Sequence, residues 1–240
     1  MPYRKLNLKE AAAYLHIPEE DVQVLAKRNE IPVERHGERL VFIKRELDAW
    51  ASQRILGLSA KRLEGYHRRT SAQAHDLSQR HTIIGELIRP DGIEVALRSA
   101  TRPSVLRDMV AQAERTGLLT ATAAELLDAL KEREALCPTA LPGGLALLHP
   151  RNHDPYMFSD SFLVFGRTTR PVPFGALDGM GTDLFFLVCC QDDRIHLHVL
   201  ARLCMMCSQT PLLPNLRSAA ARDEMLAALL AAEQAVIREL

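Results

Sequence analysis

Hydrophobic periodicity stops between residues 57 and 80, and this interruption constrains the fold of the 240-residue chain more than any other feature. The segment is polar, basic and rich in Ser and Ala, and it carries no sustained apolar stripe. At roughly 150 residues per domain, the length fits one to two domains. We therefore predict a small domain at 1–56, an interdomain linker at 57–80 and a larger domain at 81–240.

Charge is distributed unevenly, although it sums to zero. Residues 1–56 carry ten basic and nine acidic side chains, residues 57–80 carry five and two, and residues 81–240 carry fifteen and nineteen, so the nets are +1, +3 and −4. This balance excludes a uniformly basic nucleic-acid-binding coat, and any basic surface has to be local. The basic linker residues have two interpretations, solvation, which we favour, and non-specific contact with phosphates.

Composition indicates a packed chain, because 47% of the residues are hydrophobic and 25% are charged. No apolar run reaches the roughly 20 residues that span a bilayer, and the first residues lack the apolar core of a signal peptide. We therefore expect a cytoplasmic protein without membrane insertion. The five cysteines favour buried thiols in a reducing compartment over a disulfide framework.

The first part of the chain shows two short helical patterns. Residues 8–15 place apolar side chains at helical spacing, and Asn7 with Glu10 has the spacing of a capping box. After a tight turn, Pro18 suits the first position of a second helix. Residues 19–28 continue this helix with acidic residues first and basic residues last, which suits the helix dipole.

A hairpin pattern follows the two helices. Residues 31–43 alternate around His36 and Gly37, where a turn needs a permissive backbone. Residues 44–50 (KRELDAW) then predict a third helix. This order, together with 6–15 (LNLKEAAAYL), resembles the excisionase and MerR-type winged helix-turn-helix family.

The resemblance implies that the second helix enters the major groove of DNA and that the hairpin, as a wing, contacts the backbone or the minor groove. The DNA contacts implied are Gln23, Lys27, Arg28, Arg35, His36 and Arg39. Glu19, Glu20 and Asp21 begin the same helix, and DNA phosphates would repel them there. Use of the winged helix for protein contact or dimerisation therefore stays open.

From residue 81 the pattern changes to longer helices and short unbroken apolar runs. Such runs suit strands that are buried on both faces. We predict helices at 105–115, 121–133, 196–207 and 222–240 and strands at 144–148, 162–165 and 183–190. The fold class expected is an α+β two-domain chain, with a small winged helix-turn-helix followed by an α/β domain whose mixed sheet is covered by helices.

Four stretches of this second domain resemble phosphotransferase-system enzyme IIA of the fructose and mannitol class, closest to its nitrogen-regulatory branch. They are 130–134 (LKERE), 141–150 (LPGGLALLHP), 172–187 (VPFGALDG and DLFFL at its ends) and 195–200 (IHLHVL). The resemblance implies that His149 is the phosphorylated residue, that His196 is the second site histidine and that Arg133 is the site arginine. It also implies an HPr-like phosphocarrier protein as the partner.

These residue types suit the implied chemistry. A neutral imidazole is a competent nucleophile near neutral pH, and the phosphoramidate that it forms stays reactive enough to pass the group onward. Phosphoryl transfer depends mostly on positioning and charge stabilisation, so His196 and Arg133 would suffice without a metal or another cofactor.

Pro150 departs from the family, which has Pro-His-Gly where this chain has Leu148, His149 and Pro150. Proline fixes φ, lacks a backbone N–H and favours extended conformations of the preceding residue. Nearby Asn152 and His153 are candidates for replacement contacts. Phosphoryl transfer and its loss therefore stand as alternatives at this position.

A zinc site is the other chemistry that the sequence raises. The pair Cys204 and Cys207 lies inside an apolar helical pattern without a second spaced pair, and Cys189 and Cys190 alternate across a strand. We therefore expect no metal.

The leading hypothesis is a regulator that couples a phosphoryl-accepting enzyme-IIA-like domain to a DNA-binding winged helix. Its expected partners are the phosphocarrier, DNA and a second copy in a homodimer. The alternative is a domain that no longer transfers phosphate and acts as a protein-binding scaffold, with the winged helix used for protein contacts.

Overall fold

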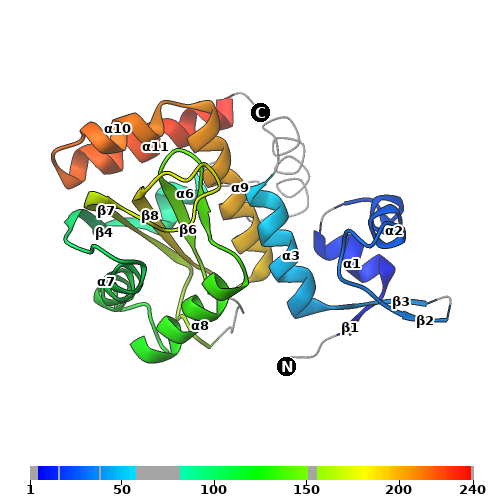
Figure 1. Cartoon of the computed structure of the whole chain (residues 1–240). Helices are drawn as coiled ribbons and strands as arrows, with labels where there is room; N and C mark the ends of the chain where they lie inside the picture. Colours follow the sequence, from blue (N-terminus) through cyan, green and yellow to red (C-terminus); the bar gives the residue numbers. More distant parts are fainter. Residues whose placement is uncertain (1–4, 16, 38, 58–81, 151–155, 239–240) are drawn as a thin grey trace.

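The computed structural model describes residues 5–15, 17–37, 39–57, 82–150 and 156–238 (Figure 1). Nearly all of the predicted linker at 57–80 lies outside these residues. None of the described helices is long and apolar enough to cross a bilayer. The elements of the N-terminal module are β1 (Lys5–Leu6), α1 (Leu8–Leu15), α2 (Glu19–Lys27), β2 (Glu34–His36), β3 (Arg39–Ile43) and α3 (Lys44–Leu56).

The N-terminal module has the predicted order of helix, helix, hairpin and helix. Its three strands form an antiparallel sheet in the order β1-β3-β2. The capping box is confirmed, because the Asn7 side chain accepts from the Glu10 N–H and the Glu10 carboxylate accepts from the Asn7 N–H, both at 2.9 Å. Pro18 occupies the N-cap position, just before the first residue of α2, because its ψ of 146° is extended. The prediction that Pro18 is the first helical residue was therefore wrong by one position.

The C-terminal domain is a five-stranded mixed sheet with helices on both faces, as predicted. The strand order is β4-β7-β8-β6-β5, with β4–β7 and β6–β8 parallel and β7–β8 and β5–β6 antiparallel. Its elements are α6 (Ile83–Leu87), β4 (Ile88–Leu97), α7 (Arg102–Arg115), α8 (Ala123–Leu136), β5 (Ala140–Leu141), β6 (Leu145–Leu148), β7 (Phe162–Val172), β8 (Thr182–Cys189), α9 (Asp193–Gln209), α10 (Leu212–Ser218) and α11 (Arg222–Arg238).

The central strands are buried on both faces, which explains their unbroken apolar sequences. In β6, Leu145 and Leu147 pack in the core that contains α9, α10 and α11. Ala146 and Leu148 pack in the opposite core with α7 and α8. Because successive side chains of a strand point to opposite faces, both layers are needed to cover β6.

The sequence analysis did not predict strand β4. Its residues Arg89, Pro90 and Asp91 are exposed and two of them are charged, and the pairing with β7 shifts register between Ile88 and Ile93. The strand therefore lacks both the unbroken apolar run and the strict alternation by which strands are recognised.

Helix α3 joins the two parts of the molecule. The predicted helix at 44–50 extends to Leu56, and α3 packs against α9 (Figure 1). Its buried residues Leu47, Ala51 and Ile55 belong to a hydrophobic cluster that also contains α9 residues. The additional helical turns are held by a contact with a distant segment, which local sequence patterns do not report.

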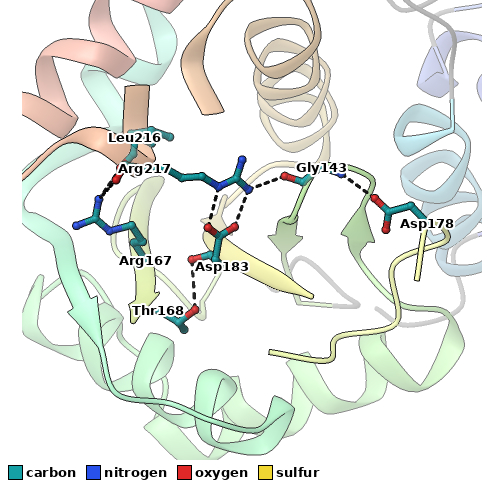
Figure 2. A network of polar contacts seen from close by, with 7 residues as sticks. All are labelled: Gly143, Arg167, Thr168, Asp178, Asp183, Leu216 and Arg217. Atoms are coloured by element: carbon teal, nitrogen blue, oxygen red, sulfur yellow. Dashed lines mark hydrogen bonds and ion pairs between the residues drawn. The ribbon is translucent and has the colours of Figure 1, made fainter. Parts of the chain in front are cut away.

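A polar network fixes the starts of β6 and β8 (Figure 2). Arg217, in α10, donates from Nε and Nη2 to the two carboxylate oxygens of Asp183 at 2.7 and 2.6 Å, and from Nη2 to the Gly143 carbonyl at 2.6 Å. Asp178 accepts from the Gly143 N–H at 3.0 Å. Gly143 and Gly144 both have positive φ, which suits the turn between β5 and β6. These contacts tie the turn before β6 to the first residues of β8.

We predict that Arg217→Ala lowers the free energy of unfolding by about 1 to 2 kcal/mol, because it removes charge-assisted hydrogen bonds that are only partly exposed. Chemical denaturation measures the change. The exposed Arg98, changed to Ala, is the matched control and should leave the unfolding midpoint within error. Equal midpoints for both variants would contradict the structural role of the network.

Candidate functional site

His149 follows the end of β6, and its two ring nitrogens have different partners. Nδ1 lies 2.8 Å from the Leu147 carbonyl, and Nε2 lies 2.8 Å from the Arg133 Nε–H. A carbonyl can only accept and a guanidinium can only donate, so the proton sits on Nδ1 and the lone pair on Nε2. The structure therefore holds a neutral imidazole with Nε2 as its nucleophilic atom.

Arg133 reaches the end of β6 from the last turns of α8 and is buried. Its Nη1 donates to the carbonyl of Cys137 at 3.0 Å and lies 3.4 Å from the Cys137 thiol. Its Nη2 is buried and has no hydrogen-bond partner among the described residues. A buried guanidinium N–H group without an acceptor is a position where an anionic oxygen could bind and accept its hydrogen bond.

His196 lies near the start of α9, and its ring stands beside that of His149. The ring centroids are 4.9 Å apart, and the planes are inclined by 52°. The three residues that the enzyme IIA resemblance implies are therefore brought together, although 63 positions separate Arg133 from His196 in the sequence.

The carboxylate next to Arg133 in the sequence is also buried. Glu134 accepts hydrogen bonds from the Thr139 backbone N–H at 3.2 Å and from the Thr139 hydroxyl. Burial raises the pKa of Glu134, and the contacts with Thr139 and the charge of Arg133 oppose this rise. Glu134 thus fixes the segment that follows α8, on which the Cys137 carbonyl is presented to Arg133.

Two residues of the N-terminal module also meet this site, and no sequence pattern pointed to them. The Oγ of Ser52, in α3, lies 3.5 Å from Nε2 of His196, and both side chains are buried. Gln53 donates from Nε2 to the Cys137 thiol at 2.9 Å. These contacts span 144 and 84 positions, so no local motif could have predicted them.

Pro150 is buried directly after His149. As the sequence predicted, this position therefore offers no backbone N–H donor next to His149 in the chain. Asn152 and His153, the candidates for replacement contacts, lie outside the described residues.

Most of the cysteines are buried thiols. Cys189, Cys190 and Cys204 are buried, and Cys137 and Cys207 are partly buried. Burial raises the pKa of Cys204 to about 12, which keeps this thiol protonated at neutral pH. In the part of the chain that the structure describes, no group of three or more His, Cys, Asp or Glu residues could hold a metal ion.

The six predicted DNA contacts lie on the exposed surface of α2 and of the β2–β3 hairpin. Some are engaged within the module, since Arg35 donates to the Ala26 carbonyl at 2.6 Å and His36 lies 3.3 Å from the Glu34 carboxylate. Glu19, Glu20 and Asp21 are exposed in the first turn of α2, as the sequence pattern predicted.

Comparison with known proteins gives the class of each part. The family model for the EIIA 2 component of the phosphoenolpyruvate-dependent sugar phosphotransferase system matches residues 86–232, and a model for a helix-turn-helix domain matches residues 6–63. The chain therefore belongs to the phosphotransferase-system EIIA type-2 family and carries a helix-turn-helix domain before it. This combination defines a regulatory protein related to the phosphotransferase system, with a module of the DNA-binding type.

The relatives and solved structures agree with this assignment. The nitrogen regulatory protein of Bradyrhizobium diazoefficiens is 30% identical over 143 residues, which is 58% of this chain and 88% of the relative. The structure of nitrogen regulatory protein IIA-Ntr from Neisseria meningitidis has a TM-score of 0.56 at 26% identity and covers 62% of this chain and 99% of its own. Mannitol IIA from Escherichia coli shares the fold, with a TM-score of 0.51 at 22% identity over 59% of this chain and 97% of its own.

We predict that nitrogen NMR at neutral pH finds His149 neutral, with Nδ1 protonated and Nε2 unprotonated, because the Leu147 carbonyl and the Arg133 guanidinium fix this tautomer. Loss of the signals in His149→Ala assigns them. A protonated Nε2 at neutral pH would show that Arg133 is not bound to this atom in solution.

Proposed function

We propose that Nε2 of His149 accepts a phosphoryl group from an HPr-like phosphocarrier protein and that this state regulates the N-terminal helix-turn-helix module. The observation that carries the proposal is the tautomer of His149, since a nucleophilic lone pair is aimed at the Arg133 guanidinium. The family match supports the same assignment.

The proposed step is an in-line exchange between two imidazoles. The bond between phosphorus and the donor's ring nitrogen breaks while a bond from phosphorus to Nε2 of His149 forms. A donor ring that is protonated on its other nitrogen leaves as a neutral imidazole with the electron pair. The positive charge then resides on the His149 ring, whose Nδ1–H donates to the Leu147 carbonyl, so no other proton acceptor is needed.

Arg133 and His196 supply charge stabilisation in this proposal. As the phosphoryl group arrives, the Arg133 Nε–H transfers its hydrogen bond from Nε2 to a phosphoryl oxygen, and Nη2 provides a second donor. The His196 ring, 4.9 Å from that of His149, lies within reach of another phosphoryl oxygen.

We expect one phosphoryl group on the intact protein after incubation with phosphoenolpyruvate, enzyme I and HPr, and none on His149→Ala. Intact-mass analysis measures it. Arg133→Lys should keep the charge but slow the gain by roughly 10- to 1000-fold, because it loses the forked donors. Phosphorylated HPr beside an unmodified wild-type chain would contradict the proposal.

We further propose that α2 and the β2–β3 hairpin bind DNA. The helix-turn-helix match and the exposure of Gln23, Lys27, Arg28, Arg35, His36 and Arg39 support this role. The acidic start of α2 argues that the approach to phosphate is made by the C-terminal part of α2 and by the wing.

We predict that Lys27→Ala with Arg39→Ala weakens DNA binding and lowers the slope of log K against log salt by about one for each phosphate that is no longer neutralised. Fluorescence anisotropy with duplex DNA measures both quantities. Lys131→Ala, on the exposed surface of α8, is the control. The absence of wild-type binding at low salt would reject the DNA-binding role.

A protein-binding scaffold is the second candidate function, and Pro150 is the observation that favours it. Proline removes the backbone donor that directly follows His149 in the chain, and the site around His149 is buried. If no phosphocarrier modifies the chain, the domain acts by binding alone, and the N-terminal module serves for protein contact.

A further inference from the structure

The side chains of the candidate phosphohistidine site are enclosed in this structure. The relative exposure is 2% for His149, 1% for Arg133 and 0% for His196. Phosphoryl transfer needs the reacting atoms about 3 to 3.5 Å apart. A phosphocarrier therefore cannot reach Nε2 of His149 until part of the enclosure moves.

Helix α3 forms one wall of this enclosure. Ser52 lies against His196, with 3.5 Å between Oγ and Nε2. Gln53 donates to the thiol of Cys137, and the same thiol lies 3.4 Å from Nη1 of Arg133. The N-terminal module thus contacts His196 directly, and it contacts Arg133 through the sulfur atom of Cys137.

Apolar packing holds α3 in this position. Ala51 and Ile55 are buried in the hydrophobic cluster that includes Leu200 and Val199 of α9. Helices α1 and α2 and the hairpin lie on the side of α3 away from the five-stranded sheet (Figure 1). The docked α3 therefore covers the His196 and Cys137 side of the site and leaves the surface of α2 and the wing uncovered.

We propose that α3 is an intramolecular cover that occupies the surface on which the phosphocarrier must dock, so that docking of α3 and phosphoryl transfer to His149 exclude each other. This inference rests on the proposed phosphoryl-accepting role of His149 and adds its regulation. In the docked state this surface binds the chain's own N-terminal module, and the phosphocarrier can bind it only after α3 has left.

Charge gives the direction of the coupling. Phosphorylation changes the net charge of the site by about −1, because the roughly two negative charges of the phosphoryl group are partly offset by the positive His149 ring. An enclosed charge is costly unless it is paired. Among the described residues, Arg133 is a cation within hydrogen-bond distance of His149, and the buried Glu134 carboxylate lies next to Arg133 in the sequence. In this proposal undocking of α3 admits water to the phosphoryl group, so phosphorylation favours release of the N-terminal module. By linkage, release of the module favours phosphorylation.

The test uses two separate variants of the full-length chain, with an arginine either at a buried position or at an exposed position of α3. Ser52→Arg inserts a large cation beside His196, whereas Glu46→Arg changes an exposed residue of the same helix and is the matched control. One readout is modification of His149 by diethylpyrocarbonate, mapped by peptide mass. The other is the rate of phosphoryl gain with phosphoenolpyruvate, enzyme I and HPr.

We expect Ser52→Arg to raise both rates by about tenfold or more, because each rate is proportional to the undocked fraction. Glu46→Arg should match the wild type. Ser52→Ala with Gln53→Ala removes both polar contacts without added bulk and should shift both readouts in the same direction. Thermal unfolding checks that each variant is folded.

The outcomes separate the cover from the proposed function. Equal labelling of His149 in the wild type, in folded Ser52→Arg and in folded Ser52→Ala with Gln53→Ala overturns the cover, whatever the phosphorylation result. Increased labelling with no phosphoryl gain in any protein supports the cover and rejects the phosphoryl-accepting role. Equal labelling with phosphoryl gain at equal rates rejects the cover and supports that role.

Discussion

The packing of α3 on α9 is the constraint on which the arrangement of this molecule depends. A single helix of the N-terminal module buries Leu47, Ala51 and Ile55 in a cluster that continues into the C-terminal domain. Because burial of apolar surface is favourable wherever it occurs, the two parts share one core instead of being joined by a linker alone. The candidate site lies at this junction, so its accessibility and the position of the winged helix are not independent.

Within the C-terminal domain, the double-sided burial of β6 determines where its chemistry can appear. All four residues of β6 are apolar and buried, and His149 follows directly beyond its end, where α8 and α9 bring Arg133 and His196 beside it. The network around Arg217 holds the opposite end of β6 and β8. The strand is thus fixed by charged groups at both ends and by apolar packing between them.

The sequence predicted the elements whose stability is local and missed those whose stability is not. The Asn7–Glu10 capping box and the unbroken apolar strands were confirmed because their signals lie within a few residues. Strand β4 was missed because its polar start breaks the pattern. The family resemblance named Arg133, His149 and His196, which residue spacing could not have grouped, and their proximity is confirmed. Their roles stay predictions.

By itself, the sequence determined that the chain has a winged helix-turn-helix pattern followed by a helix-covered sheet, since capping, turn chemistry and hydrophobic period are properties of short segments. It also determined that His149 precedes a proline and lacks the family's glycine. The tertiary structure decided which nitrogen of His149 carries the proton and that Ser52 and Gln53 lie at the site. These outcomes depend on contacts between residues far apart in the chain, and such contacts exist only once the two parts have packed together.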